Sequence, residues 1–71
     1  MAQTETGKNF DELDERDFHT LSDSELAAYA DWAAREGDRL FAEGEHPDIV
    51  GEYHLLADLA GGELVQRGVR S

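Results

Sequence analysis

Cysteine is absent from this chain of 71 residues, and proline occurs once, at Pro47. Without cysteine there is no disulfide framework, no thiolate metal site and no catalytic thiol. No apolar run approaches the roughly 20 residues that span a bilayer, and Met1 to Phe10 contain no apolar stretch typical of a secretory signal. We therefore expect a cytoplasmic protein that makes no membrane contact.

Basic residues are also scarce, since six Lys and Arg stand against 17 Asp and Glu, a formal charge of -11. A nucleic acid would meet net repulsion, so we expect no direct nucleic-acid binding. The excess of acidic residues has two open interpretations: it forms a recognition surface for a basic partner protein, or it keeps the protein soluble in a salty cytoplasm. Under either interpretation, repulsion between crowded carboxylates should raise their pKa values in the folded chain. We therefore expect the stability of the fold to increase as the pH falls from 7 towards about 5.

No motif of a catalytic or cofactor site is present. Gly61-Gly62 is followed by Glu63 and Leu64 with no lysine behind them, which excludes a phosphate-binding loop. A domain of this size also encloses little volume in which carboxyl pKa values could be driven apart for acid–base work. We expect no enzymatic activity, no catalytic residue and no cofactor.

Two of the three histidines have a glutamate close to them in the sequence, Glu43 near His46 and Glu52 near His54, which suggests a metal site. An i,i+2 pair on a helix points about 200° apart, however, so Glu52 and His54 cannot share an ion. Metal binding is therefore only a weaker alternative, and exposed histidines, including His19, are the simpler interpretation.

The clearest structural signal is a helix start at Ser22. Ser22 and Glu25 match a capping box, and Leu21 with Leu26 match a hydrophobic staple. The pattern predicts a helix over 23–43 that ends at Gly44. One face of this helix is apolar, with small side chains in its middle and large ones at its ends, which indicates a close contact with another helix. The apolar stripe comprises Leu26, Ala30, Ala33, Gly37 and Leu40, flanked by Tyr29 and Phe41.

A second helix is predicted over 47–67, since Pro47 suits a first helical turn and Gly68 a helix stop. We expect it to continue through Gly61-Gly62. Its stripe comprises Ile49, Tyr53, Leu56, Ala60 and Leu64, and is widened by Val50, Ala57 and Leu59, while Leu55 lies outside it. This face is wider than one partner helix covers.

The tripeptide His46-Pro47-Asp48 between the two helices resembles the signature of J-domain co-chaperones. The resemblance covers these three residues alone. A J-domain carries a basic helix before the tripeptide, whereas this stretch includes Glu36, Asp38, Glu43 and Glu45. Proline at the first helical turn explains the tripeptide structurally.

The N-terminal stretch carries Phe10, Leu13 and Phe18 near helical spacing among acidic residues. A short helix over about 10–17 is predicted, which needs a surface to rest on because it is too short to be stable alone. Trp32 offers that surface, because it points away from the stripe of its own helix. We expect Phe10, Leu13 or Phe18 to fold over it.

Together these patterns predict an all-α protein: an antiparallel helical hairpin with a short N-terminal helix packed across it. Residues 1–9 form a mobile tail, 10–68 a single helical domain and 69–71 a mobile C-terminus. The wide apolar face favours a homodimer with a four-helix arrangement, and covering of that face by the N-terminal stretch is the alternative.

The predicted function is that of a small acidic protein-interaction or regulatory module without catalytic activity. The candidate partner-binding residues are Trp32, Leu55, Val50 and Leu59. The alternative is an inhibitor or antitoxin-like mimic, whose carboxylates occupy a basic nucleic-acid-binding site on a partner protein.

Overall fold

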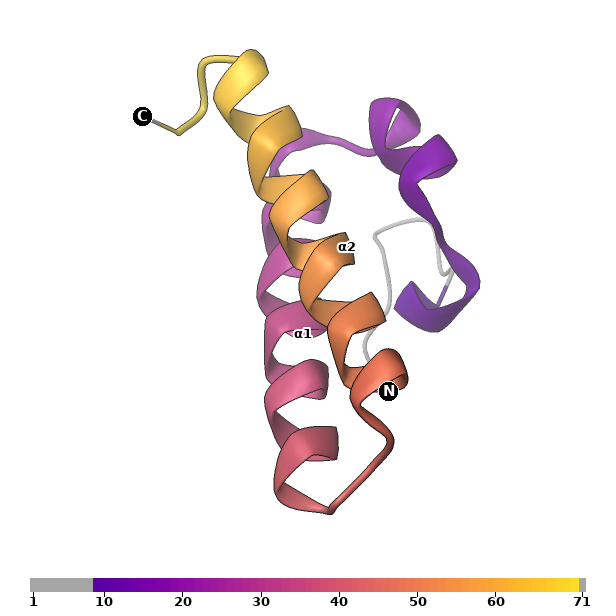
Figure 1. Cartoon of the computed structure of the whole chain (residues 1–71). Helices are drawn as coiled ribbons and strands as arrows, with labels where there is room; N and C mark the ends of the chain where they lie inside the picture. Colours follow the sequence, from indigo (N-terminus) through magenta and orange to yellow (C-terminus); the bar gives the residue numbers. More distant parts are fainter. Residues whose placement is uncertain (1–8, 71) are drawn as a thin grey trace.

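The computed structural model describes residues 9–70 of the chain, and all its elements are helical. Two short 3-10 helices, η1 (Phe10–Glu12) and η2 (Glu15–Thr20), precede two long helices, α1 (Asp23–Ala42) and α2 (Pro47–Gln66). Figure 1 shows α1 and α2 side by side and antiparallel, with the N-terminal stretch running beside α2. The expected helical hairpin is confirmed. Within residues 9–70, none of the helices combines the length and the hydropathy that a membrane crossing requires.

The α1 helix begins where the capping box predicts. The Glu25 backbone N–H donates to the Ser22 hydroxyl at 3.1 Å, and the Ser22 N–H donates to the Glu25 carboxylate at 3.0 Å. Leu21 and Leu26, the predicted staple, are both buried. The helix ends at Ala42 with Glu43 as its C-cap, and the next residue, Gly44, has a φ of +81°, the left-handed conformation that glycine adopts without strain.

The α2 helix begins at Pro47 and passes through Gly61-Gly62 without a break, as expected. His46 is its N-cap: the Asp48 N–H donates to His46 Nδ1 at 3.2 Å. At the other end Val69 and Arg70 donate their N–H groups back to the Leu64 carbonyl. The mobile ends predicted over 1–9 and 69–71 stay predictions, and residues 1–8 and 71 of them lie outside the described part.

The two long helices meet through the small-residue stripe of α1. Ala30, Ala33 and Gly37 are buried, and a Cβ at Gly37 would overlap the His54 ring. Two details of the expected contact are wrong. Phe41 does not close its end but is 73% exposed, and Ile49 is exposed as well.

The buried face of α2 is instead turned toward Val50, which is only 6% exposed. Ala60 is fully buried, and Ala57 packs against the same core. Small side chains permit the closest helix approach. The α1 helix meets α2 at Gly37, which faces His54, and at Trp32, whose ring packs on Tyr53. This rotation corrects the expectation that Val50 lies at the open edge of the face.

The N-terminal stretch contains two short 3-10 helices in place of the single helix predicted over 10–17. The chain is extended at Leu13 and Asp14, which interrupts any helix there. Asp14 caps η2, since its carboxylate accepts the Arg16 N–H at 2.9 Å and its own N–H donates to Asp17 at 3.1 Å. Asp14 therefore favours a new helix start over the continuation of η1.

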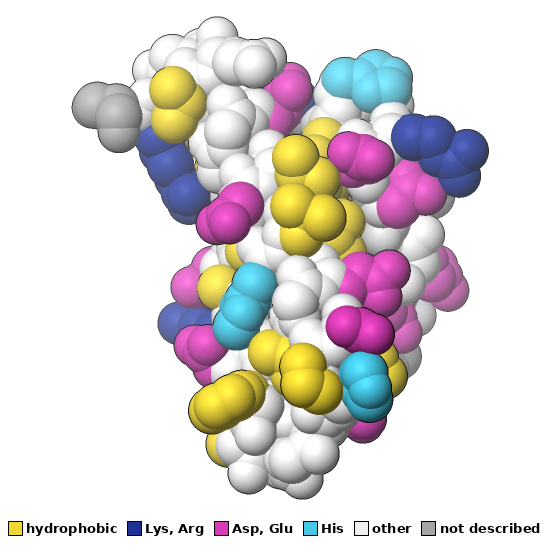
Figure 2. All heavy atoms as spheres, viewed as in Figure 1, with side chains coloured by type: hydrophobic (Ala, Val, Ile, Leu, Met, Phe, Trp, Pro, Cys, Tyr) yellow, Lys and Arg dark blue, Asp and Glu magenta, His cyan; other side chains and the backbone are white. Residues whose placement is uncertain are grey.

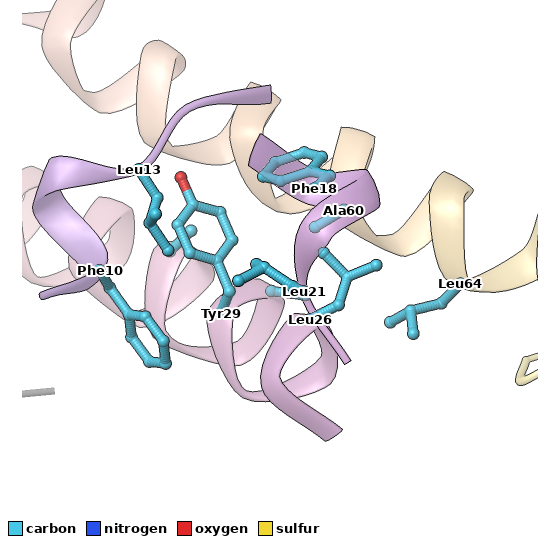
Figure 3. Packing of buried hydrophobic residues seen from close by; sticks show 10 residues of the cluster. Phe10, Leu13, Phe18, Leu21, Leu26, Tyr29, Ala60 and Leu64 are labelled. Atoms are coloured by element: carbon cyan, nitrogen blue, oxygen red, sulfur yellow. The ribbon is translucent and has the colours of Figure 1, made fainter. Parts of the chain in front are cut away.

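Residues 9–21, which we call the arm, fold onto the hairpin through large side chains. Phe10, Leu13, Phe18 and Leu21 are all buried. The rings of Phe10 and Phe18 lie 5.6 and 5.2 Å from that of Tyr29, and Figure 3 shows this cluster joined to Leu26, Ala60 and Leu64. Phe10 also packs on Trp32 at 5.6 Å, so the expected cover of Trp32 is confirmed.

Candidate binding groove

Three adjoining hollows, of about 330, 270 and 310 Å³, follow the line between the arm and α2. The first and second share Asp14, Glu52 and Leu56, and the second and third share Glu15 and Leu59. Because neighbouring hollows share lining residues, we describe the three together as the arm groove. Its remaining lining residues are Phe10, Asp11, Leu13, Arg16, Phe18, His19, Tyr29, Trp32, Ile49, Tyr53, Leu55, Asp58, Gly62, Glu63 and Gln66.

The α2 wall of the arm groove is apolar. Leu55 is 56% exposed and Leu59 37%, and Leu56 on the same wall is half-buried. Figure 2 shows apolar side chains in the middle of this face with carboxylates on both sides. Exposed leucines one helical turn apart give a surface on which another apolar side chain can be buried.

Carboxylates edge the groove from both walls. The arm contributes Asp11, Asp14 and Glu15, and α2 contributes Glu52, Asp58 and Glu63. Among the described lining residues, the charged base is Arg16, which is already paired with Asp14 at 3.1 Å. The groove is therefore apolar along its α2 wall and negative along its edges.

Arg67 fastens the arm to the far end of α2. Its guanidinium donates to the Phe18 carbonyl at 2.7 Å and to the Leu21 carbonyl at 2.8 Å. The same group pairs with Asp23 at 3.1 Å and with Glu63 at 3.2 Å. The sequence analysis missed this residue, because its partners on the arm lie more than 40 positions away. A basic residue at a helix end is too common a feature to identify such a contact.

The opposite end of the groove is aromatic. The Trp32 ring lies 5.6 Å from Phe10, 5.7 Å from Tyr29 and 5.8 Å from Tyr53 of α2. Tyr29 is fully buried, and its hydroxyl has no hydrogen-bond partner among the described residues. Burial, with the nearby charge of Asp14, raises the pKa of Tyr29 to about 12. The hydroxyl therefore stays protonated at neutral pH.

Three of the four predicted partner-binding residues line the arm groove. Trp32 lies in the first hollow, Leu55 in the second and Leu59 in both the second and the third. Val50 does not line it, since its side chain is buried in the hairpin. The sequence analysis did not identify Tyr53, Leu56 or the carboxylates of the groove as parts of one site, because the course of the arm brings them together.

The resolved carboxyl shifts run against the expected general repulsion. Arg16 hydrogen-bonds to Asp14 and lowers its pKa, and Arg39 hydrogen-bonds to Glu36 and does the same. Arg39 lies 2.7 Å from Glu36 and 2.7 Å from Glu43. For Asp14 and Glu36 the predicted upward shift of the pKa is wrong, since a specific pair outweighs the surrounding acid.

The histidines do not converge. His46 caps α2, and His54 lies 3.1 Å from Asp38 on α1. Within residues 9–70, no three His, Asp or Glu side chains are grouped so that they could hold a metal ion. The described structure therefore does not contain the metal site that the sequence suggested at Glu43, His46, Glu52 and His54.

Apolar side chains and carboxylates equip the arm groove to bury an apolar group and to attract a positive one. Comparison with known proteins adds nothing to this geometry: no family model, no curated protein and no solved structure matches the chain.

Proposed function

We propose that this chain is a small acidic protein-interaction module without chemistry of its own, and that its arm groove binds a basic amphipathic segment of a partner protein. The observation that carries the proposal is the pair of exposed leucines on α2, Leu55 and Leu59, which lie between carboxylates of both walls. The cytoplasmic location stays a prediction.

The occupant follows from the chemistry of the groove. An amphipathic helix presents apolar side chains one turn apart, which matches the spacing of Leu55 and Leu59. Basic residues beside that stripe would meet Asp14 and Glu15 on one wall and Glu52 and Asp58 on the other. A second copy of this chain would instead bring carboxylates against carboxylates, so charge favours a basic partner over a homodimer through this surface.

The first test uses a synthetic amphipathic peptide of Leu and Lys, about 18 residues long so that a helix can form. Calorimetry with the full chain should give saturable binding. The double variant Leu55→Gln/Leu59→Gln should weaken it about tenfold, because it removes the apolar contact. Phe41→Gln is the matched control, since Phe41 is exposed but lines none of the three hollows.

A second pair of variants separates the groove from diffuse charge. Glu52→Gln/Asp58→Asn removes two charges from the groove, and Asp31→Asn/Glu43→Gln removes two charges from residues that line none of the hollows. The groove pair should weaken peptide binding more than the control pair. Equal losses would contradict the groove as the binding site and indicate general attraction to an acidic surface.

Ionic strength and oligomeric state distinguish the remaining alternatives. Binding that disappears in high salt and ignores Leu55→Gln/Leu59→Gln would favour the acidic mimic of a nucleic acid over a docking groove. A dimer in sedimentation equilibrium that Leu59→Gln dissociates would assign the groove to a second copy of the chain.

A further inference from the structure

The first hollow of the arm groove collects aromatic rings from separate segments of the chain. Phe10 of the arm, Tyr29 and Trp32 of α1 and Tyr53 of α2 line a space of about 330 Å³. The chain contains six aromatic residues, so most of them gather here. Asp11, Asp14 and Glu52 line the same space. Ring faces and carboxylates share one property, which is attraction for a positive charge.

The Tyr29 hydroxyl supplies an independent sign of a ligand. Tyr29 is fully buried and lines the hollow, and its oxygen has no hydrogen-bond partner among the described residues. Figure 3 shows the side chain leaving α1 toward the arm, with the oxygen beside Leu13. A buried hydroxyl without a partner is costly. A ligand that donates a hydrogen bond into the hollow would remove that cost.

We propose that this hollow receives the guanidinium group of an arginine side chain from the bound partner segment, an inference that rests on the proposed function. A guanidinium can stack its plane on an aromatic ring while its N–H groups point sideways to carboxylates and to a hydroxyl. Trp32 and Tyr53 provide aromatic rings, and Asp11 and Glu52 provide charged acceptors.

Other occupants fit this lining less well. An apolar side chain would leave the Tyr29 hydroxyl unpaired and would desolvate Glu52 and Asp11 without supplying a positive charge. An anion would face carboxylates. A lysine ammonium has the right charge, but it is more strongly hydrated than a guanidinium and cannot stack as a plane.

The test uses N-acetyl-arginine methylamide on the full chain, with the neutral isostere N-acetyl-citrulline methylamide and the corresponding lysine compound as controls. Trp32 is the single tryptophan, so its fluorescence and its indole NMR signal report on this hollow. The arginine compound should saturate both signals. The citrulline compound should bind at least about tenfold more weakly, because it lacks the charge, and the lysine compound should fall between them. Failure of the arginine compound to saturate, or equal binding of citrulline, overturns the proposal.

Two conservative variants assign the contacts. Tyr29→Phe keeps the ring and removes the hydroxyl, and Glu52→Gln removes one charge from the rim. Each should weaken arginine binding several-fold, whereas Asp31→Asn, outside the hollow, should not. Thermal melts of the free variants distinguish a lost contact from a lost fold: Tyr29→Phe should melt no lower than the parent, because it deletes an unpaired hydroxyl. Unchanged arginine affinity in both variants would place the ligand elsewhere.

The two proposals fail separately. If the amphipathic peptide binds through Leu55 and Leu59 but the arginine compound does not bind, the result supports the arm groove as a docking site and contradicts the proposed arginine subsite. If the arginine compound binds and the peptide does not, the hollow accepts a free guanidinium compound, and the docking of a protein segment is wrong.

Discussion

The α1 helix makes two contacts that differ in the size of the side chains involved. One contact is with α2, and the other is with the arm. The small buried residues Ala30, Ala33 and Gly37 of α1 characterise the first, where Gly37 faces His54 of α2, and small side chains let the helices approach closely. Phe10 and Phe18 form the second around Tyr29, with ring centroids 5.2 to 5.6 Å apart. The aromatic contact is the one that borders the groove.

The difference shows where a small helical protein can place a binding surface. Two regular helices with small residues between them close on each other. An irregular segment of 3-10 turns meets the hairpin only where its large side chains reach, so space remains along its edge. The arm contributes to the core and also to one wall of the groove.

The strongest test of the arm as part of the core is Phe18→Ala. Phe18 is buried against Tyr29, so its truncation should cost about 3–5 kcal/mol of unfolding free energy in urea titrations followed by circular dichroism. Phe41→Ala removes the same ring from an exposed site and should cost little. Matching midpoints for the two variants would show that the arm is not part of the folded core.

Ala33→Leu tests the close contact of the two long helices. Ala33 is fully buried between them, so the larger side chain should overpack the contact and cost about 1–3 kcal/mol. Ala28→Leu places the same side chain on the exposed face of α1 and should be nearly neutral. Equal effects on the unfolding midpoint would mean that the buried face of α1 is a different one.

These two contacts also differ in how far the sequence predicts them. Periodicity and caps locate both long helices within a residue of their ends, because Ser22, Gly44, Pro47 and Gly68 act through local backbone chemistry. The rotation of α2 toward Val50 depends on which small residues meet across the hairpin, which no single helix pattern contains.

The groove was predictable only in part. Trp32, Leu55 and Leu59 stand out in the sequence because each misses a regular apolar stripe or lies at its edge. The carboxylates that face them come from the arm, whose course depends on the break at Asp14 and on Arg67. Contacts more than 40 residues apart leave no local signal.

Arg67→Met would loosen the arm without removing any ring. The guanidinium that holds the Phe18 and Leu21 carbonyls is lost, so we expect a lower free energy of unfolding and faster exchange of amide hydrogens in residues 9–21. Arg35→Met is the control, since its pair with Asp31 is exposed. Equal protection of the arm in both variants would rule out Arg67 as its fastening.

The smallest expected effect is the dependence of stability on pH. It arises from one carboxyl group in the arm and one on α1, so the two regions can be compared. Arg16 lowers the pKa of Asp14 in the arm, and Arg39 lowers the pKa of Glu36 on α1. A carboxyl with a lowered folded pKa adds stability above its ordinary value, and this is lost as the pH falls through the folded value. The melting temperature should therefore stay level from pH 7 to about 5 and fall below about pH 4.5, where these groups take up protons.

The variants Asp14→Asn and Glu36→Gln should each flatten the acid limb of that curve slightly, because both ion pairs are exposed to solvent. Circular dichroism melts from pH 7 to pH 3 measure both effects. A melting temperature that rises between pH 7 and 5 would contradict the prediction, since it would mean that repulsion within the acidic chain outweighs the specific pairs of Asp14 and Glu36.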